Sequence, residues 1–284
     1  NGMRGSCCIT SSYEARSLGV KTGMNIRDAR KLAPGLIQAP ARPQRYAEVS
    51  TRIMKALEDI SPTIEIFSVD EAFLDMTHCQ NYWGSDAEKI GWMIKEKIYE
   101  VSGLLCSVGV SGDKTTAKWA AKRMKPNGLT VVEPWKAEET LAPHPVTDLC
   151  GIKGGIGGHL AQYGVYNCGD MKRIPMVELS RRFGNPGKRY WLMAQGKDPD
   201  EVNTKVKDPK SLFHGKVIPP NTKDRAVLEV FLRHMCEKVG RRLRKYSFEA
   251  SEFSVGLLTK IGWLWMRFTT EQATQDGAVL LQKI

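Results

Sequence analysis

Two adjacent carboxylates, Asp70 and Glu71, lie inside an apolar stretch at residues 67–75 and strongly constrain how this chain can fold. Like charges a few ångströms apart repel each other and resist burial unless cations neutralise them. Hard divalent ions such as Mg²⁺ supply that charge and prefer carboxylate oxygen. Because adjacent side chains of one strand point to opposite faces, both acids can serve one metal site only if the chain turns there. The pair therefore predicts a hairpin turn, with a merely solvated hairpin tip as the alternative.

The charge of the chain indicates a polyanionic partner. There are 42 Lys and Arg residues against 31 Asp and Glu, which gives a net charge of +11. Residues 205–245 contain 12 basic and 4 acidic side chains, so this segment carries +8 and all the others together +3. A basic run is often only a solvated face, but so uneven a distribution favours a phosphate-binding module.

Cysteine usage and hydropathy indicate the compartment. The seven cysteines are scattered and form no Cys-x-x-Cys pair, so we expect a reducing environment and neither a disulfide framework nor a zinc site. No apolar run approaches the length of a membrane span, and no signal peptide is recognisable. We therefore expect a cytoplasmic protein.

The first 133 residues alternate helical and strand-like patterns, which is typical of an α/β or α+β sheet domain. Helices are predicted at 13–18, 26–32, 46–60, 86–101 and 115–124. Strands are predicted at 7–10, 104–110 and 129–132, in addition to the acidic hairpin.

The rest of the chain has a different character. Residues 134–196 read as helices with short glycine-containing connections, and the charged residues 197–210 contain no apolar period and read as a linker. Asn221 is predicted to precede a strong helix, with Asp224 as its capping partner. Strands are then expected at 252–258 and 263–269, followed by the start of an apolar helix at 278–281.

Residues 107–115 superficially suggest a phosphate-binding loop. A Walker loop needs glycine at the positions of Val108 and Asp113, so that interpretation fails. The simpler interpretation is a capped helix with Asp113 or Ser111 at its start. The helix is nevertheless strongly basic, through Lys114, Lys118, Lys122, Arg123 and Lys125.

Three segments resemble the Y family of translesion DNA polymerases, most closely its bacterial DNA polymerase IV (DinB) branch. They are residues 68–75 (Ser-Val-Asp-Glu-Ala-Phe-Leu-Asp), residues 107–132 with Lys-Pro-Asn-Gly before a strand, and residues 10–20. They occur in the family's order, and the resemblance covers nearly the whole chain. Three separate motifs are far more specific than any one alone.

The resemblance implies a fold. We expect an α+β multidomain protein: a polymerase right hand with fingers, a palm with a mixed or antiparallel sheet and a helical thumb with a helix-hairpin-helix, plus an α/β little finger domain. The implied division is residues 1–42 fingers (partial), 43–133 palm (partial), 134–200 thumb, 201–210 linker and 211–284 little finger (incomplete at its end).

The resemblance also implies roles for individual residues. Asp70 and Glu71 would be catalytic carboxylates that bind two Mg²⁺ ions, with Mn²⁺ as an alternative, and Glu71 would lie close to the primer 3′ oxygen. The incoming triphosphate would be bound by Thr10, Tyr13, Arg16 and Lys125. Arginine offers forked donors to phosphate, and lysine a compact charge.

Each triphosphate residue also has a structural alternative. Tyr13 could cover the edge of a core, and Lys125 could be an ordinary charge at the end of a helix. Arg16 could pair with Glu14 or Asp28.

Two further groups would contact DNA. Gly151, Lys153 and Gly154 belong to a segment that resembles a helix-hairpin-helix, which presents backbone N–H groups to phosphate without reading sequence. Lys153 stands where such families usually have glycine, and a purely structural helix turn is the alternative. His214 and Lys216 would lie on the first little-finger strand, at 211–216.

The implied function is template-directed transfer of a nucleotide from a dNTP to a primer 3′-OH, in low-fidelity translesion synthesis during DNA repair and the SOS response. The implied partners are primer-template DNA, a dNTP and a sliding clamp reached through a C-terminal segment. A monomer near the nucleoid is expected. The alternatives are a non-catalytic relative that binds primer-template DNA or a protein partner and, more remotely, a P-loop hydrolase.

The chain departs from the family at both ends. The family's first palm strand carries an Asp-x-Asp-x-Phe-Phe-like motif with another metal ligand, and this sequence has no such motif. The end of the little finger is also not recognisable. We therefore expect a fragment without an intact two-metal site.

Overall fold

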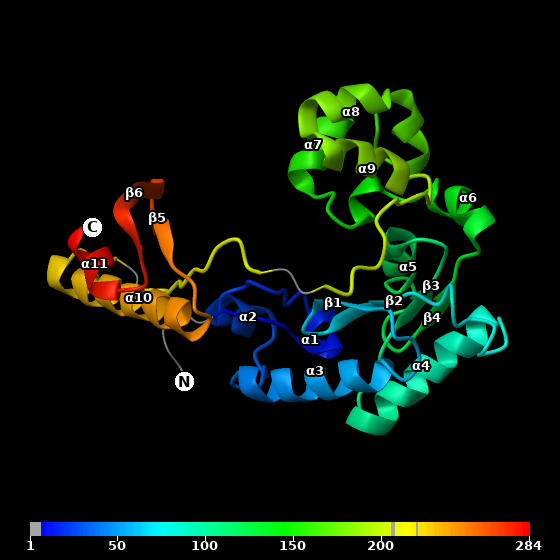
Figure 1. The fold of residues 1–284 in the computed structure, drawn as a ribbon, viewed down its shortest axis with the longest axis horizontal. Helices are drawn as coiled ribbons and strands as arrows, with labels where there is room; N and C mark the ends of the chain where they lie inside the picture. Colours follow the sequence, from blue (N-terminus) through cyan, green and yellow to red (C-terminus); the bar gives the residue numbers. More distant parts are fainter. Residues whose placement is uncertain (1–6, 206–207, 220) are drawn as a thin grey trace. The chain divides into compact units, whose positions relative to one another are not determined.

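The chain folds into two compact units. The computed structural model describes residues 7–205, 208–219 and 221–284. One unit comprises Arg42–Val206, and the other combines Asn1–Ala41 with Lys207–Ile284. Both units contain helices and strands (Figure 1), an α+β architecture as the sequence predicts.

The N-terminal segment forms two short helices, α1 (Tyr13–Ser17) and α2 (Ile26–Leu32). Ser12 and Asn25 cap them by accepting hydrogen bonds from backbone N–H groups of the first turns. Small side chains bury easily here, and the core is formed by Cys8, Ala15, Val20, Ala29 and Ala33. The predicted strand at 7–10 is wrong, because it reduces to a single bridge between Cys7 and Asn25.

The acidic hairpin lies in the larger unit. β1 (Ile64–Ser68) pairs antiparallel with β2 (Glu71–Leu74), and an irregularity interrupts the register between Ile66 and Ser68. α3 (Pro43–Leu57) and α4 (Ala87–Ser102) pack together, and α4 begins at the side-chain cap Asp86. The core between these elements is formed by Met54, Leu57, Ile60, Ile64, Ile90 and Ile94.

A second pair of strands is parallel. β3 (Val108–Val110) pairs with β4 (Leu129–Val131), and α5 (Lys114–Ala120) connects them. The predicted strand at 104–110 is too long, because only three residues of β4 offer backbone partners. Leu104 and Leu105 are exposed instead. The predicted helix at 115–124 likewise ends at Ala120 and continues as turns.

Residues 134–193 are helical, as predicted. Their elements are η1 (Pro134–Lys136), α6 (Ala137–Leu141), η2 (Val146–Asp148), α7 (Gly154–Ala161), η3 (Cys168–Arg173), α8 (Met176–Phe183) and α9 (Asn185–Met193). A single core joins these helices to α5 and to the residue that follows β4, because Trp119, Ala120 and Val132 belong to it together with Leu149 and Leu160.

The charged stretch at 197–210 is not a free linker at its start. The Asp198 carboxylate is buried and accepts two hydrogen bonds of 2.8 Å from Arg189. Asp200 pairs with Lys114 at 3.1 Å, and the N–H of Asn203 donates to Glu65 at 2.7 Å. The segment has no apolar period because charged hydrogen bonds, and not apolar packing, hold its start against the larger unit.

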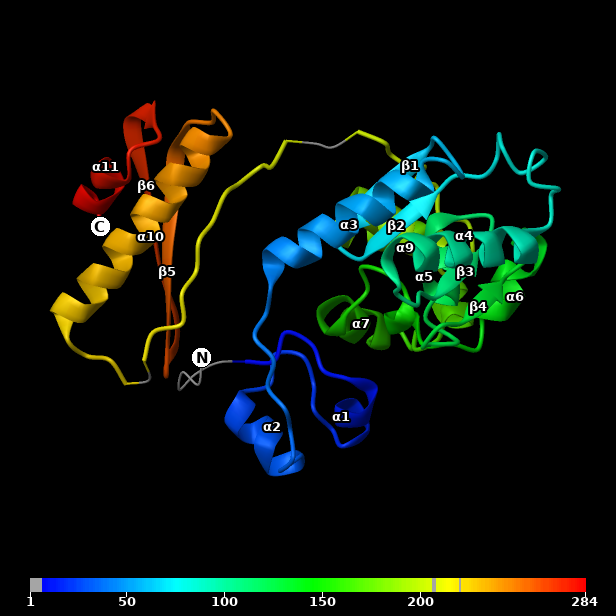
Figure 2. The same ribbon diagram turned by 90° about the horizontal axis from the view of Figure 1, so that it is seen from below.

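The C-terminal part contains α10 (Arg225–Lys245), β5 (Ala250–Thr259), β6 (Gly262–Thr274) and α11 (Gly277–Gln282). β5 and β6 form an antiparallel hairpin, longer than predicted, and α11 packs against α10 (Figure 2). This contact needs glycine on both helices. A Cβ at Gly240 would lie 2.7 Å from the Gln275 carbonyl oxygen, and one at Gly277 would lie 2.9 Å from the Cys236 backbone.

Two predictions for this part are wrong in detail. Asp224, not Asn221, is the N-cap of α10, with its carboxylate accepting from the Ala226 N–H at 2.9 Å. Residues 211–216 form no strand. The Phe213 carbonyl instead accepts a 2.6 Å hydrogen bond from Arg242, so a side chain of α10 takes the place of a neighbouring strand.

Candidate active site

Asp70 and Glu71 lie at the turn between β1 and β2. Asp70 is exposed in the turn, and its carboxylate accepts a 2.8 Å hydrogen bond from the Ser68 hydroxyl. Glu71 opens β2 opposite Ser68. The chain therefore turns where the sequence analysis requires it. The flanking side chains of Ile66, Phe67 and Val69 are exposed, so this hairpin end is not the buried apolar setting that the sequence suggested.

Helix α5 supplies a counter-charge to this turn. The Lys118 ammonium lies 2.6 Å from the Glu71 carboxylate and 4.3 Å from the centre of the Phe67 ring. The Lys118 side chain is 12% exposed and that of Glu71 is 43% exposed, so the pair is only partly shielded from water. One of the two neighbouring carboxylates is thus neutralised by the protein itself.

The start of α5 is a capped helix, as the simpler interpretation predicted. The Asp113 carboxylate accepts from the Thr116 N–H at 2.9 Å. Burial raises the pKa of Asp113, although its hydrogen bonds with Thr116 act in the opposite direction. The loop before α5 is therefore a helix cap and not a nucleotide-phosphate loop.

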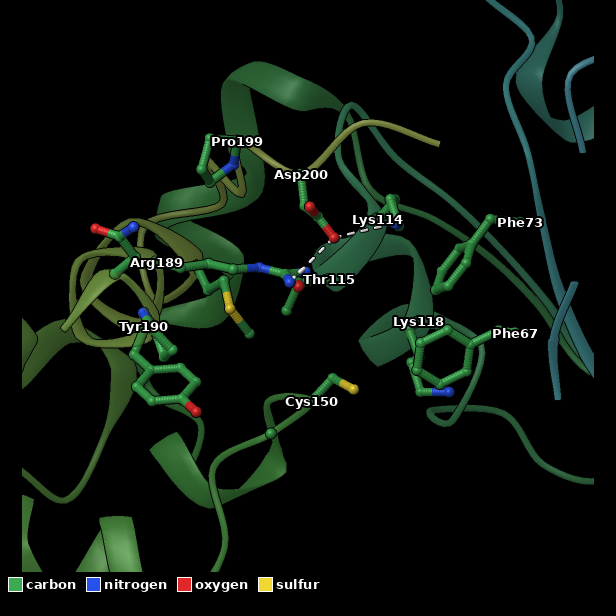
Figure 3. A pocket seen from close by; sticks show the side chains of 14 residues that line it. Phe67, Phe73, Lys114, Thr115, Lys118, Cys150, Arg189, Tyr190, Pro199 and Asp200 are labelled. Carbon is green, nitrogen blue, oxygen red and sulfur yellow. Dashed lines mark hydrogen bonds and ion pairs between the residues drawn. The ribbon is translucent and has the colours of Figure 1, made fainter. Parts of the chain in front are cut away.

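A network of ion pairs surrounds Lys114, the first residue of α5. Its ammonium is 8% exposed and lies 2.7 Å from Glu65 and 3.1 Å from Asp200. Arg189 of α9 contacts the same Asp200 at 3.0 Å (Figure 3). This network links the strand before the acidic turn to α5, α9 and the segment that follows α9.

The sequence analysis did not foresee a pocket beside this network. It has a volume of about 530 Å³, and Figure 3 shows aromatic side chains on opposite sides of it. Its lining includes Phe67, Phe73, Lys118, Gly151, Arg189 and Tyr190. These residues come from four distant segments with no shared motif, so no sequence signal could have grouped them.

Three of the four predicted triphosphate residues lie together on the N-terminal segment. Arg16 donates a 3.1 Å hydrogen bond to the Thr10 hydroxyl, and its guanidinium lies 5.0 Å from the centre of the Tyr13 ring. Neither predicted alternative for Arg16 is present: within the described residues no carboxylate lies within 4.0 Å of it, and Asp28 pairs with Lys31. Tyr13 is 48% exposed and does not belong to the core of this segment.

The fourth, Lys125, belongs to the larger unit. It lies in the loop between α5 and β4 and is exposed.

The predicted helix-hairpin-helix lies between η2 and α7. Gly151 has φ +88°, a conformation that strains other residues, and a Cβ there would lie 3.3 Å from the Tyr190 ring. Lys153 is the N-cap of α7 without a side-chain capping bond, and Gly154 opens the helix facing open space. The start of α7 thus has no side-chain cap for its first backbone N–H groups.

His214 and Lys216 lie in an extended segment beside α10. The His214 ring centre is 5.9 Å from that of His234. Burial lowers the pKa of His214, and the positive charge of Arg242, His234, Lys238 and Lys216 lowers it further. This surface is thus rich in positive charge even without the predicted strand.

Asp70 and Glu71 have the right chemistry for a hard divalent cation, although they are only part of a ligand set. Magnesium in nucleotide sites is commonly held by one or two carboxylates plus substrate phosphates and water. In the described part of the chain, no group of three or more His, Cys, Asp or Glu side chains is arranged to hold a metal ion. The pair fits the ion and would need further oxygen ligands.

Comparison with known proteins identifies the class of fold. Residues 1–122 match the family described as "impB/mucB/samB family", and residues 209–283 match the C-terminal domain of that family. A Y-family DNA polymerase chimera built on Dbh superposes with a TM-score of 0.81 and 28% identity, over 99% of this chain and 82% of that one. DinB from Sulfolobus solfataricus superposes with a TM-score of 0.63 and 28% sequence identity, over 98% of this chain and 83% of that one. The fold is that of the polymerase right hand.

Curated relatives agree. DNA polymerase IV of Moorella thermoacetica is 37% identical over 83% of this chain and 59% of its own length. DNA polymerase IV of Pelotomaculum thermopropionicum is 33% identical over 96% of this chain and 69% of its own length. The chain thus spans about three fifths to two thirds of the length of these relatives, and it belongs to the Y family of DNA polymerases, on its DinB-like branch.

Among the described residues, no helix is both long and apolar enough to cross a membrane.

Proposed function

We propose that this chain carries out template-directed DNA synthesis, adding a nucleotide from a dNTP to a primer 3′-OH, in the translesion manner of its family. The observation that carries the proposal is the carboxylate pair at the β1–β2 turn, with one member held by a lysine of the basic helix α5. The relatives named DNA polymerase IV support it. The relatives described above are named as polymerases, which favours a catalytic chain over a non-catalytic relative.

In this proposal Asp70 and Glu71 hold the divalent ions, Mg²⁺ or Mn²⁺. The bound ions would supply positive charge to the phosphates and lower the pKa of the primer hydroxyl. The protein's own contribution is positional. The turn presents both carboxylates from consecutive residues, and Lys118 restrains the Glu71 side chain at 2.6 Å before any substrate binds.

The N-terminal segment would bind the triphosphate. Arg16 stacks near Tyr13 and bonds Thr10 while its charge has no carboxylate partner among the described residues, so its forked donors suit phosphate oxygens. Lys125 of the larger unit would add a point charge to the same triphosphate. Positioning and charge neutralisation, more than covalent chemistry, carry phosphoryl and nucleotidyl transfer.

Primer-template DNA would bind through two surfaces. The backbone N–H groups at Gly151 and Gly154, with the Lys153 ammonium, would contact phosphate at the thumb hairpin. His214 and Lys216 would contact phosphate through the basic little finger. One structural neighbour is described as an insertion ternary complex of Dbh DNA polymerase, which supports this assignment. Clamp binding and a cytoplasmic location stay predictions of the family resemblance.

Primer extension by the full-length gene product tests the proposal. We expect Asp70→Asn and Glu71→Gln each to reduce nucleotide incorporation at least about 100-fold, because each removes metal-binding charge. Asp75→Asn is the matched control. It removes a carboxylate four residues after Glu71 that accepts a hydrogen bond from the Thr77 N–H in a local turn. Normal extension by the Asp70 and Glu71 variants would refute the proposed catalytic site.

A further inference from the structure

The cations on helix α5 and in the turns after it differ in their partners: three pair with carboxylates, whereas Lys122 and Lys125 form no ion pair among the described residues. Lys114 and Lys118 pair with carboxylates, as described above. Arg123 pairs with Asp148 at 3.1 Å and stacks 4.4 Å from the centre of the Trp119 ring. Lys122, four residues after Lys118, has no carboxylate within 4.0 Å in the part of the chain that the structure describes. Its charge is therefore available to a ligand.

The end of α5 is fixed beside the thumb hairpin. Trp119 and Ala120 lie in the same core as Leu149 and Ile152, which flank the hairpin tip. The Arg123–Asp148 ion pair ties the two segments at their surface. Lys118 lines the same pocket as Cys150 and Gly151 (Figure 3). Lys122 thus stands on the palm side of a junction with the hairpin.

Lys153 supplies a second cation at this junction, from the thumb side. Its ammonium contacts the Thr147 carbonyl at 3.4 Å and pairs with no carboxylate of the described residues. Burial lowers the pKa of Lys122, and the neighbouring ammonium groups of Lys153 and Lys118 lower it further, while Cys150 and Glu71 act weakly in the opposite direction. Like charges held together without a counter-ion are unfavourable, and a bound anion relieves that repulsion.

We propose that Lys122 and Lys153 form a two-lysine clamp that bridges helix α5 and the thumb hairpin and binds a backbone phosphate of the primer strand. The choice of the primer strand rests on the proposed function, which sets Glu71 beside the primer 3′ oxygen. Lys118 contacts Glu71, and Lys122 follows four residues later, in the turns that continue from the end of α5 at Ala120. A strand that ends at Glu71 and runs along α5 reaches Lys122 just upstream of its 3′ end.

The clamp positions DNA without reading its sequence. Lysine is a compact point charge that suits a phosphate oxygen, and contacts to the backbone set register rather than base preference. Because its two lysines come from two elements, a bound phosphate would also hold the hairpin against α5. The clamp is separate from the backbone N–H groups at Gly151 and Gly154.

The salt dependence of primer-template binding by the 284-residue chain tests the clamp. Fluorescence anisotropy gives the association constant at several salt concentrations for Lys122→Gln, Lys153→Gln and the double variant. We expect the slope of log K against log salt to fall by about 1 for each single variant and about 2 for the double variant. Lys122→Arg should keep the wild-type slope, as should the control Lys89→Gln, an exposed lysine of α4.

An uncharged phosphate identifies the strand. A series of primers each carries one methylphosphonate, placed at a different position upstream of the 3′ end. At one of these positions we expect Lys122→Gln and the wild type to bind primer-template with equal affinity, because the phosphate charge that Lys122 contacts is already missing. The same replacement in the template strand should leave the full cost. Cancellation by a template position instead would overturn the proposal.

The outcomes separate this proposal from the proposed function. If the wild type binds primer-template and Lys122→Gln keeps the wild-type slope, the clamp is refuted while the polymerase assignment stands. If the wild type itself shows no salt-dependent binding to primer-template, both are refuted. Melting curves of the variants confirm that slopes are compared between folded proteins.

Discussion

At the scale of single residues, cations that are neighbours in the sequence have different structural roles. Lys95, on α4, is 6% exposed and donates to the Cys106 carbonyl at 2.7 Å and to the Asn127 carbonyl at 2.8 Å. Lys97, two residues later, forms an ion pair of 3.2 Å with Asp59, whose side chain is 70% exposed. The first ties α4 to the loop before β4, and the second lies at the surface.

This difference predicts unequal costs of removal. We expect Lys95→Ala to lower the free energy of unfolding by about 3 kcal/mol, because it removes a buried ammonium and leaves two partly buried carbonyl oxygens without its hydrogen bonds. Lys97→Ala should cost less than about 1 kcal/mol, as exposed ion pairs do. Urea unfolding followed by circular dichroism measures both. Equal losses for the two variants would contradict the structural role of Lys95.

Cysteine reactivity should differ just as sharply. Burial raises the pKa of Cys168 to about 12, and nearby Asp148 adds to the effect, whereas Cys7 is exposed. A thiolate is the reactive form, so at pH 8 we expect a thiol reagent to label Cys7 readily and Cys168 only after unfolding. Mass spectrometry of the labelled peptides measures this. Rapid native labelling of Cys168 would contradict its burial.

At the scale of elements, charged side chains join parts that apolar packing alone would leave separate. Asp198 connects the segment after α9 to Arg189 and, through a 2.5 Å hydrogen bond, to Thr115 of α5. Burial tends to raise the pKa of Asp198, but the hydrogen bonds from Arg189 and Thr115 outweigh it, so its pKa lies below the usual value. The carboxylate is therefore stabilised in its charged form by the fold.

The lowered pKa fixes the sign of a pH dependence. In the unfolded chain an Asp titrates near pH 3.9, so the stabilisation from Asp198 is fully present above that value and is lost as pH falls through the lower folded pKa. We expect Asp198→Asn to cost about 3 kcal/mol at pH 7 and clearly less near pH 2. Urea unfolding of both proteins at the two pH values measures this. A pH-independent difference would contradict the argument.

At the scale of the whole molecule, two units are joined by a segment that is anchored at one end. Glu65 accepts from the Asn203 N–H and pairs with Lys114, so the chain is held to the larger unit up to residue 203. The division between the units falls directly after Val206. Residues 198–203 of the linker that the sequence predicts at 197–210 are therefore anchored to the larger unit.

Limited proteolysis should reveal this anchor. We expect trypsin to cut the native chain first after Lys205 or Lys210, and Glu65→Gln to speed that cut several-fold because it loosens residues 200–203. Glu48→Gln, which removes only an exposed pair with Arg45, is the control. Equal cutting rates for all three proteins would show that the Glu65 contacts do not restrain the segment in which trypsin cuts.

The sequence by itself determined the family and most helices, because these depend on local patterns. α2 coincides with the predicted helix at 26–32, and the Asp113 cap and the turn at Asp70 follow from residues close in the chain. Periodicity, capping and short motifs act over a few residues, so one sequence suffices to find them. Strand lengths and the strand at 211–216 were predicted poorly, because pairing depends on a distant partner.

Only the tertiary structure decided which charges meet. Nothing local distinguishes Lys114, which is buried, from Lys118, which pairs with Glu71, or from Lys122, which has no carboxylate partner among the described residues. The three are spaced four residues apart, the first two on α5 and the third in the turns after it. The partners of Lys114 and Lys118 come from β1, the acidic turn and the segment after α9, up to 86 residues away in the sequence. The energy of a charge depends on burial and on opposite charges within a few ångströms, and both are properties of the folded chain.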